Sequence, residues 1–312
     1  MKLGIFFAPG AARGAYGAGV AQALINEGGL HFDLVAGTSV GALNGAFVAS
    51  GQVDRLVEVW KTSKTRDILG VDWKGLAKGA VVWSRSLLTN MPQKRHIIDP
   101  YLTDAEFPPG VRLRCNLDDL QALTEEFFEW PGAPFPITDG VHASMAMVGM
   151  IVPFEALGTE WCDGGVLCGN PLEEIALSQG IDRLFVVGVA PRSPMDEWCL
   201  SSRDVVMRTS EWSQFSETLI NIQRAREVND LVTAWAAYRE AALDAAPADG
   251  REEIEQLLDS IQFPYSRPAV DIVEILPEKT LDLFFIDYSP PTSTRLVEIG
   301  YADGLRTLAS LG

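Results

Sequence analysis

The sequence predicts an α/β fold: a largely parallel β-sheet covered by helices on both faces, with a helical insertion. Three observations lead to this prediction. Short apolar runs of strand length alternate along the chain with helical patterns. A chain of 312 residues, 47% of them hydrophobic, can bury one large core. A glycine-flanked serine at residues 37–41 separates an apolar run from a helical stretch, as at the end of a central strand. We therefore expect one α/β domain over residues 1–312.

The apolar runs place seven strands. They are predicted at Leu3–Ala8, Asp33–Ala36, Val111–Leu117, Glu125–Trp130, Leu184–Ala190, Asp271–Leu276 and Leu281–Ile286. Helical patterns between them include Ala15–Asn26, Ala42–Ser50 and Asp54–Trp60. The strands around Leu117 and Glu125 could form an antiparallel pair within the otherwise parallel sheet. The first run could also begin a secretory leader, but it is short and ends at Pro9, so we expect a core strand.

The segment 201–261 differs from the rest of the chain in its pattern of apolar residues. Apolar residues recur there at helical spacing, and Pro247–Gly250 interrupts the pattern before a second run, Glu252–Leu258. This predicts one or two long amphipathic helices. Two interpretations stay open: a lid that covers an acyl chain over a functional site, or a helical layer packed on the sheet.

The strongest chemical motif is Gly37-Thr38-Ser39-Val40-Gly41, which has the form Gly-x-Ser-x-Gly. Two glycines let the chain turn sharply between strand and helix and present the serine hydroxyl, with the amide groups of the helix N-terminus nearby. Ser39 is therefore a candidate nucleophile, expected on a surface turn. Because the chain has 28 glycines, the same pentapeptide could be a tight turn without chemistry.

A serine nucleophile needs a base to take its proton, and histidine is the usual one. The chain has three histidines, His31, His96 and His142. A serine–acid–histidine order with a late histidine is ruled out, since none follows His142. An order of Ser39, then Asp118 or Asp119, then His142 stays open without a supporting motif.

A second motif offers a different base. Asp163-Gly164-Gly165 predicts a tight turn that presents the aspartate carboxylate close to another backbone segment. On its own it could be a hairpin turn. Together with Ser39, it supplies a carboxylate that could accept the serine proton directly.

These motifs, in this order and after a glycine-containing segment behind the first strand, resemble those of the patatin-like phospholipases. The stretch Ala143–Phe154 before Asp163 is similar to the family, as are Leu281–Tyr288 and Ile299–Gly304 near the end. The resemblance covers most of the chain except a middle segment. It implies a patatin-like α/β fold and a serine–aspartate dyad, with Ser39 as nucleophile and Asp163 as base.

The same resemblance locates an oxyanion loop, where the sequence departs from the family pattern. The family carries three glycines, a variable residue, a basic residue and a glycine; the matching positions are Pro9, Gly10, Ala11, Ala12, Arg13 and Gly14. Pro9 has no amide to donate. The methyl group of Ala11 disfavours positive φ, so we expect the loop to work only if Ala11 has an ordinary backbone conformation. Gly10, Ala11 and Ala12 still supply amides, and Arg13 supplies a charge.

Composition limits the partners. The formal net charge of −17 argues against nucleic acid and against electrostatic binding to anionic membranes, so lipid contact should be apolar and local. The cysteines, Cys115, Cys162, Cys168 and Cys199, lack metal-type spacing and are expected to be free thiols. No cofactor or metal is expected, and the oligomeric state is unknown. We expect a cytoplasmic protein that touches membranes at most peripherally.

The sequence as a whole predicts a serine-dependent lipid acyl hydrolase, of the esterase, lipase or phospholipase A type, acting through an acyl-enzyme. Two alternatives stay open. An acyltransferase would share the first half-reaction and pass the acyl group to an alcohol. A catalytically weakened lipid-binding relative is suggested by Pro9 and Ala11.

Overall fold

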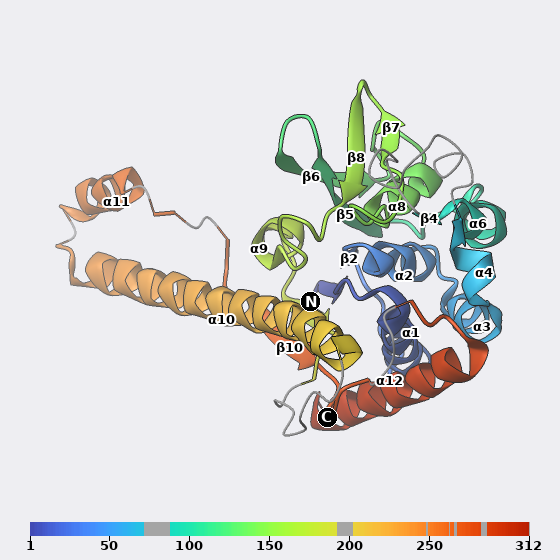
Figure 1. The fold of residues 1–312 in the computed structure, drawn as a ribbon. Helices are drawn as coiled ribbons and strands as arrows, with labels where there is room; N and C mark the ends of the chain where they lie inside the picture. The colour runs from blue at the N-terminus through green and yellow to red at the C-terminus, as the bar shows by residue number, and fades with distance from the viewer. Residues whose placement is uncertain are drawn as a thin grey trace.

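The computed structural model of the protein describes residues 1–71, 88–191, 202–247, 249–261, 263–264, 267–281 and 286–311. These residues form an eight-stranded, mostly parallel sheet with strand order β10-β9-β1-β2-β5-β8-β7, in which β6 pairs with β5 (Figure 1). The sheet does not close into a barrel. The predicted α/β fold is confirmed.

Five neighbouring strands of the sheet run parallel: β1 (Leu3–Phe7), β2 (Leu34–Gly37), β5 (Arg112–Asp119), β9 (Arg183–Val187) and β10 (Asp271–Ile275). Three antiparallel strands complete it at the β5 end: β6 (Thr124–Trp130), β7 (Phe154–Ala156) and β8 (Thr159–Asp163). The antiparallel pair around Leu117 and Glu125 is thus confirmed. The β7–β8 hairpin was not predicted, and the core of the predicted strand Leu281–Ile286 lies outside the described residues.

Helices cover both faces of the sheet because β1 is apolar on both faces. Ile5 and Phe7 pack with α1 (Gly14–Gln22), α2 (Val40–Ala49), α3 (Val53–Thr62) and α12 (Pro290–Leu311). Phe6 and Ala8 pack on the opposite side with α9 (Leu172–Ile175) and part of α10 (Ser202–Ala245). The N-terminal run is therefore a buried core strand, as predicted.

Shorter elements complete the described chain. A 3₁₀ turn (Ala11–Arg13) precedes α1, and a π-helical turn (Ala23–Glu27) extends it. The remaining helical segments are α4 (Thr65–Ile68), α6 (Met91–Gln93), a π-turn (Lys94–Ile98), α7 (Asp99–Leu102), α8 (Ile137–Ser144), a 3₁₀ turn (Leu177–Gln179) and α11 (Arg251–Ser260). Strands β3 (Gly70–Val71) and β4 (Leu88–Thr89) form a separate small ribbon.

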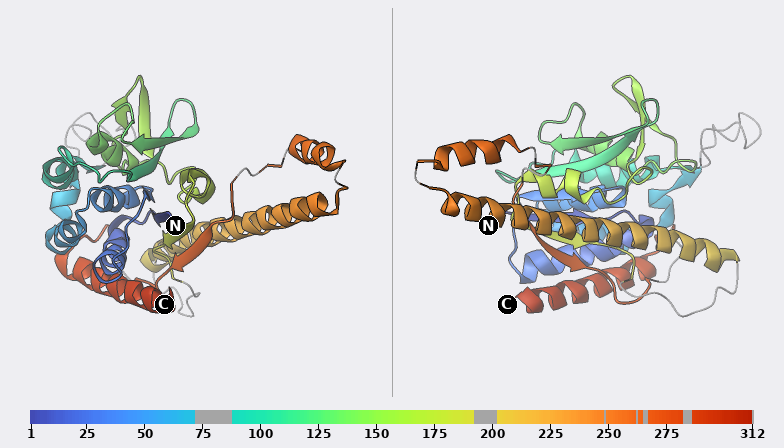
Figure 2. Two further views of the ribbon diagram at one scale, coloured as in Figure 1. Left: turned by 180° about the vertical axis from the view of Figure 1, so that it is seen from behind. Right: turned by 90° about the vertical axis from the view of Figure 1, so that its left-hand side faces the viewer.

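The predicted helical insertion is a long projecting arm. Ile222 and Ala225 of α10 are buried against the sheet, whereas its later turns and α11 extend away from the domain (Figures 1 and 2). Trp235 of α10 stacks on Phe263 after α11, with ring centroids 5.3 Å apart. None of the helices in the described ranges is both long enough and apolar enough to cross a bilayer.

Candidate active site

The register of β5 brings the two sequence motifs together. Gly37, the last residue of β2, pairs with Cys115, and Asp163, the last residue of β8, pairs with Leu117. Strands β2 and β8 therefore approach each other from opposite directions along one edge of β5. Ser39, two residues after the end of β2, and Asp163, at the end of β8, therefore meet at the carboxyl end of the parallel strands, where open α/β sheets bind ligands.

Ser39 is held in an unusual backbone conformation at the start of α2. Its φ is 57° and its ψ is −125°, which is rare for a residue other than glycine. The turn is also tightly packed, because a Cβ on Gly41 would lie 2.0 Å from the carbonyl oxygen of Phe7. Ser39 is only 6% exposed, so the expected surface turn is in fact buried, and Ser39 lines a pocket. The conformation directs the hydroxyl away from the helix and toward β8.

The Ser39 hydroxyl donates a hydrogen bond to Asp163. The distance from Oγ to Oδ2 is 2.6 Å, and the other carboxylate oxygen accepts the backbone N–H of Gly165 at 2.9 Å. Burial raises the pKa of Asp163 to about 6, against the opposing effect of these two hydrogen bonds. The carboxylate is therefore a stronger proton acceptor than an exposed aspartate and remains ionised at neutral pH.

Two polar residues that sequence reasoning missed surround this pair. Ser144, at the end of α8, accepts the backbone N–H of Ser39 on its Oγ at 2.9 Å. Asn116 of β5 lies between the two motifs and accepts the Thr38 hydroxyl at 2.6 Å. The sequence offered one signal for Asn116, an amide residue between the apolar Cys115 and Leu117 in a predicted core strand.

His142, the histidine of the alternative triad, lies on α8 and packs against Phe154. It is 6% exposed and packs edge-on against Phe154, with ring centroids 6.0 Å apart. Burial, followed by the charge of Lys94, lowers the pKa of His142 to about 4. The hydroxyl of Ser39 is directed to Asp163 instead. Of the two acids considered for a triad, Asp118 accepts the backbone N–H of Leu167 at 3.0 Å and Asp119 accepts the Thr159 hydroxyl at 2.6 Å.

The candidate oxyanion loop forms the 3₁₀ turn after β1. Ala11 has a φ of 49°, so the condition set for the loop, an ordinary backbone conformation at Ala11, is not met. The loop keeps a backbone geometry that glycine adopts freely and that alanine adopts at a cost of about 1–2 kcal/mol. Ala11 lines the same pocket as Ser39. The Arg13 side chain is 1% exposed, and its backbone N–H donates to the carbonyl of Gly10 at 3.0 Å.

The motif glycines allow close contacts that a side chain would prevent. A Cβ on Gly37 would meet the backbone of Gly41 at 2.3 Å, and one on Gly164 would meet the carbonyl oxygen of Asn116 at 2.5 Å. Gly14, at the start of α1, packs against Val40 of the serine turn. A side chain at Gly37 or at Gly164 would therefore push apart segments whose backbones are in direct contact.

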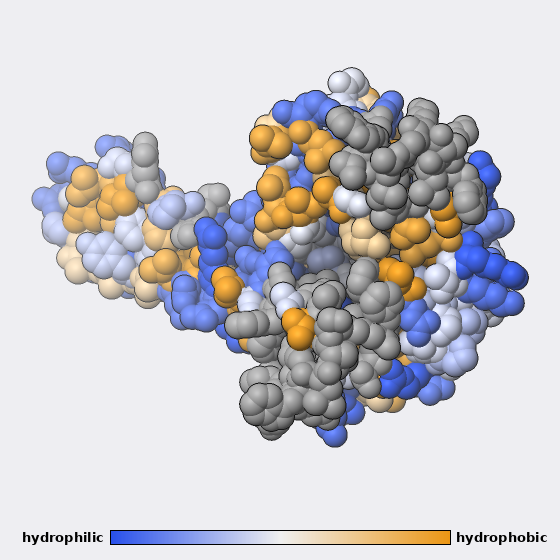
Figure 3. All heavy atoms as spheres, viewed as in Figure 1, coloured by the Kyte–Doolittle hydropathy of each residue, from blue (hydrophilic) through white to orange (hydrophobic). Residues whose placement is uncertain are grey.

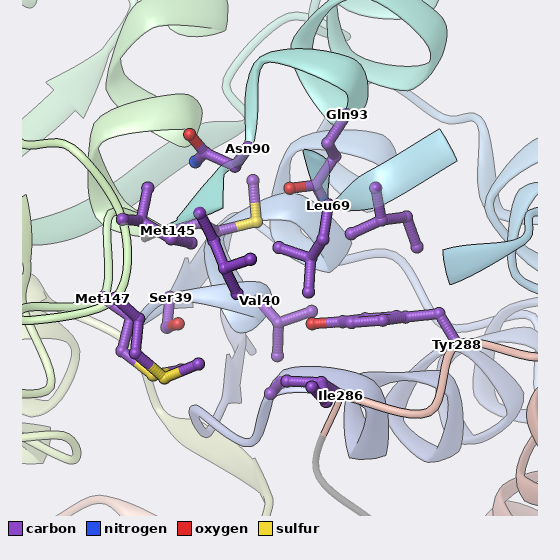
Figure 4. Close-up of a pocket in the computed structure, with 14 residues that line it drawn as sticks. Ser39, Val40, Leu69, Asn90, Gln93, Met145, Met147, Ile286 and Tyr288 are labelled. Carbon is purple, nitrogen blue, oxygen red and sulfur yellow. The ribbon is translucent and has the colours of Figure 1, made fainter. Parts of the chain in front are cut away.

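A narrow, mostly apolar pocket opens beside Ser39. Its volume is about 30 Å³, room for one or two water molecules. Aliphatic and methionine side chains dominate its lining, with Asn90, Gln93 and Tyr288 as polar members. Figure 4 shows Met145 and Met147 on the Ser39 side and the Tyr288 hydroxyl directed toward Val40. Methionine side chains repack readily, so such a pocket can widen around an apolar chain.

Helix α10 contacts the aspartate loop, residues 163–170, through Glu217. Glu217 of α10 accepts the backbone N–H of Asn170 at 3.1 Å and that of Gly169. No α10 or α11 residue is among the described residues that line the pocket. The lid role of segment 201–261 stays a prediction. Cys115, Cys162 and Cys168 are free thiols, and Cys199 lies outside the described residues.

Comparison with known proteins gives a consistent set of relatives. A sequence profile described as "Patatin-like phospholipase" matches residues 5–176. An uncharacterized NTE family protein of Mycobacterium tuberculosis is 28% identical over 177 residues, which cover 56% of this chain and 46% of that protein. Lysophospholipase NTE1 of Saccharomyces cerevisiae is 25% identical over 218 residues, or 69% of this chain and 12% of that protein. The chain thus matches less than half the length of these relatives.

A solved structure shares the fold. The crystal structure of VipD from Legionella pneumophila superposes with a TM-score of 0.52 and 14% sequence identity. The superposition covers 99% of this chain and 67% of that one. At this identity the similarity concerns the arrangement of strands and helices alone.

Proposed function

The chain belongs to the patatin-like phospholipase family, and from this premise we propose that it is a serine-dependent lipid acyl hydrolase with a Ser39–Asp163 dyad. Family membership supports a lipid hydrolase in the broad sense. The observation that carries the finer proposal is the 2.6 Å hydrogen bond from the Ser39 hydroxyl to a buried carboxylate.

In the proposed first step, Asp163 takes the Ser39 proton on Oδ2 while Oγ attacks the ester carbonyl carbon. The tetrahedral intermediate then collapses and its C–O bond to the alcohol breaks. The proton on Asp163 passes to the departing alcohol oxygen. Ser39 is left as an acyl ester and Asp163 is ionised again.

In the second step, Asp163 takes a proton from water, whose oxygen attacks the acyl-enzyme. Collapse of this second intermediate releases the fatty acid and returns the proton to Ser39. The same group therefore serves as base and acid in each half-reaction. Its raised pKa supports both roles, because the protonated form is accessible near neutral pH.

We propose that backbone amides of the loop at Gly10, Ala11 and Ala12 hold the negative oxygen of both intermediates. The position of Ala11 in the wall of the Ser39 pocket supports this assignment. The N-terminus of α2, the positive end of its helix dipole, is proposed to stabilise the same negative oxygen. The buried Arg13 is proposed to stabilise the loop rather than to touch substrate.

The proposed substrate is an acyl ester of a lipid, since the pocket is lined mainly by aliphatic and methionine side chains. The name lysophospholipase, carried by fungal relatives, suggests a single-chain phospholipid as the first to test. The pocket must widen to admit an acyl chain, which its methionines permit.

Contact with a lipid surface is proposed to be local and apolar. Exposed hydrophobic residues occur at the tips of the β5–β6 and β7–β8 hairpins, Leu123 and Leu157, and in the aspartate loop at Val166 and Leu167. Figure 3 shows hydrophobic surface (orange) on the part of the domain that these hairpins form. The net charge of −17 disfavours anionic surfaces.

A fluorophosphonate probe tests the proposal. We expect covalent labelling of the wild-type protein, mapped to Ser39 by peptide mass spectrometry and abolished in Ser39→Ala. Absence of labelling in a folded protein would favour a lipid-binding relative weakened at Ala11. Product analysis with added lysolipid separates hydrolysis, which releases fatty acid, from acyl transfer, which yields a diacyl lipid.

A further inference from the structure

The side chain of Asn116 connects the serine turn to the aspartate turn. It is fully buried in β5, and its Oδ1 accepts the Thr38 hydroxyl at 2.6 Å. Its Nδ2 donates to the carbonyl oxygens of Gly164 at 3.0 Å and Cys168 at 3.1 Å. Thr38 immediately precedes Ser39, and Gly164 immediately follows Asp163. One amide therefore contacts the neighbours of both members of the dyad.

The orientation of this amide is set by its partners. Nδ2 also lies 2.8 Å from Oε1 of Glu125, so its neighbours are two carbonyls and a carboxyl group, all of which accept hydrogen bonds. The Thr38 hydroxyl supplies the donor that Oδ1 requires. An aspartate or an aliphatic residue could not satisfy both sides.

The backbone of Asn116 adds a second connection. Its carbonyl oxygen accepts the Ser144 hydroxyl at 3.2 Å, and the same Ser144 oxygen accepts the Ser39 N–H. The next residue of β5, Leu117, pairs with Asp163 in the sheet. Gly164 has no room for a side chain because Asn116 occupies that space. The hydrogen bonds that join Asn116 to Thr38, Gly164 and Ser144 are buried, so a lost partner there leaves an unsatisfied polar group.

We propose that Asn116 is a positioning residue that sets the separation of Ser39 and Asp163. It touches neither reacting atom and acts through Thr38 and Gly164. This inference rests on the proposed dyad mechanism. Displacement of a reacting group by about 1 Å can cost up to about 10²-fold in rate, so a loosened connection should lower kcat rather than weaken substrate binding.

The test uses Asn116→Ala and the pair Thr38→Val and Thr38→Ser on a short p-nitrophenyl ester. We expect Asn116→Ala and Thr38→Val to lower kcat about 10- to 100-fold while KM stays within about two-fold of the wild-type value. Thr38→Ser keeps the hydroxyl and should retain most of the wild-type kcat. Thr159→Val is the matched control, because it removes a threonine hydroxyl hydrogen bond of the same length, 2.6 Å, to Asp119 in the same sheet but away from the dyad. Its kcat should stay within about two-fold of wild type.

The pH profile separates positioning from mere structural support. The hydrogen bond from Ser39 lowers the pKa of Asp163, so a longer Ser39–Asp163 distance should raise that pKa. The acid limb of kcat/KM should then move to higher pH in Asn116→Ala and Thr38→Val. If a variant merely contained less folded protein, kcat/KM would fall by the same factor at every pH, and the midpoint of its acid limb would not move.

Three outcomes are decisive. A folded Thr38→Val with wild-type kcat and an unmoved acid limb overturns the inference, whether or not Asn116→Ala folds. Loss of rate in Thr38→Ser equal to that in Thr38→Val also overturns it. Full activity of Ser39→Ala would instead refute the proposed function itself, so the two failures are distinguishable.

Discussion

Two turns meet at the pocket, and each holds a residue other than glycine at positive φ: Ser39 at 57° and Ala11 at 49°. At Ser39 the surroundings support the conformation, since Ser144 accepts its N–H and Gly41 packs directly on Phe7. Ala11 lines the pocket and carries a methyl group at a φ that glycine adopts freely. The difference indicates that strain at Ser39 aims a hydroxyl, whereas strain at Ala11 reflects a glycine-type loop built with alanine.

The largest expected effect concerns the packing of the serine turn. Gly41→Ala would place a methyl group 2.0 Å from the carbonyl oxygen of Phe7, and neither backbone can move without disturbing the sheet. We expect a loss of at least about 3 kcal/mol in the free energy of unfolding, measured by urea denaturation.

Gly45→Ala, on the same helix, is the matched control for that substitution. Its methyl group would lie 3.1 Å from the Leu113 side chain and 3.3 Å from that of Val35, with the carbonyl oxygen of Ala36 at an ordinary 3.9 Å. Alanine also favours the helix by about 1 kcal/mol. Its stability should stay within about 1 kcal/mol of wild type. Equal losses in both variants would show that the serine turn is not specially constrained.

The second expected effect concerns the charge of Asp163. If its carboxylate is the base, kcat/KM should fall about ten-fold per pH unit below the pKa of about 6. A rate–pH profile of the wild-type protein on a neutral ester measures this. A flat profile down to pH 5 would contradict the assignment.

The same raised pKa has the opposite effect on stability: ionisation of Asp163 is needed for the proposed activity but lowers the free energy of unfolding. Because folding raises the pKa of Asp163, the folded protein binds this proton more tightly, and ionisation between about pH 4 and 6 lowers stability. Asp163→Asn should therefore be more stable than wild type at pH 7, by an amount on the order of 3 kcal/mol, with the gap closing below about pH 4. Denaturant midpoints at the two pH values test it, and a variant less stable at pH 7 would contradict it.

The smallest effect is expected at the other turn. Ala11→Gly removes the conformational cost at Ala11, so we expect kcat to rise, by less than the ~10²-fold that one oxyanion donor supplies. Stability should change by less than about 1 kcal/mol, because glycine also gains entropy in the unfolded chain. A large loss of activity would show that the loop has been misassigned.

Ala12→Gly is the matched control in the same loop. Ala12 does not have positive φ, so glycine relieves nothing there and should cost about 0.5–1 kcal/mol in the free energy of unfolding. If Ala12→Gly raised kcat as much as Ala11→Gly, the effect would come from loop flexibility rather than from relief of strain at Ala11.

Local patterns predicted the parts of the fold that depend on local sequence. The apolar run at Leu3–Ala8 and the serine motif before Val40 are each encoded within a few residues. The first forms the predicted strand β1, and the second lies at the start of the predicted helix, α2. The β7–β8 hairpin escaped prediction because β7 is only three residues long and half-exposed.

The supports of the candidate site escaped prediction for a different reason. Asn116 and Ser144 come from β5 and α8, far from either motif in sequence, and their roles depend on the register that pairs Leu117 with Asp163. The conformation of Ala11 was also set by tertiary context against its local preference. Neither can be read from residue type and spacing alone.

The most direct test of the central claim compares four variants on one ester: Ser39→Ala, Asp163→Asn, their double mutant and His142→Ala, with folding checked by circular dichroism. If Ser39 and Asp163 act as a unit, each single variant should lose about 10³-fold or more in kcat/KM, and the double mutant should be little worse. His142→Ala, which removes a buried ring packed on Phe154, should keep near wild-type activity per folded molecule. An inactive, folded His142→Ala beside an active Asp163→Asn would contradict the dyad.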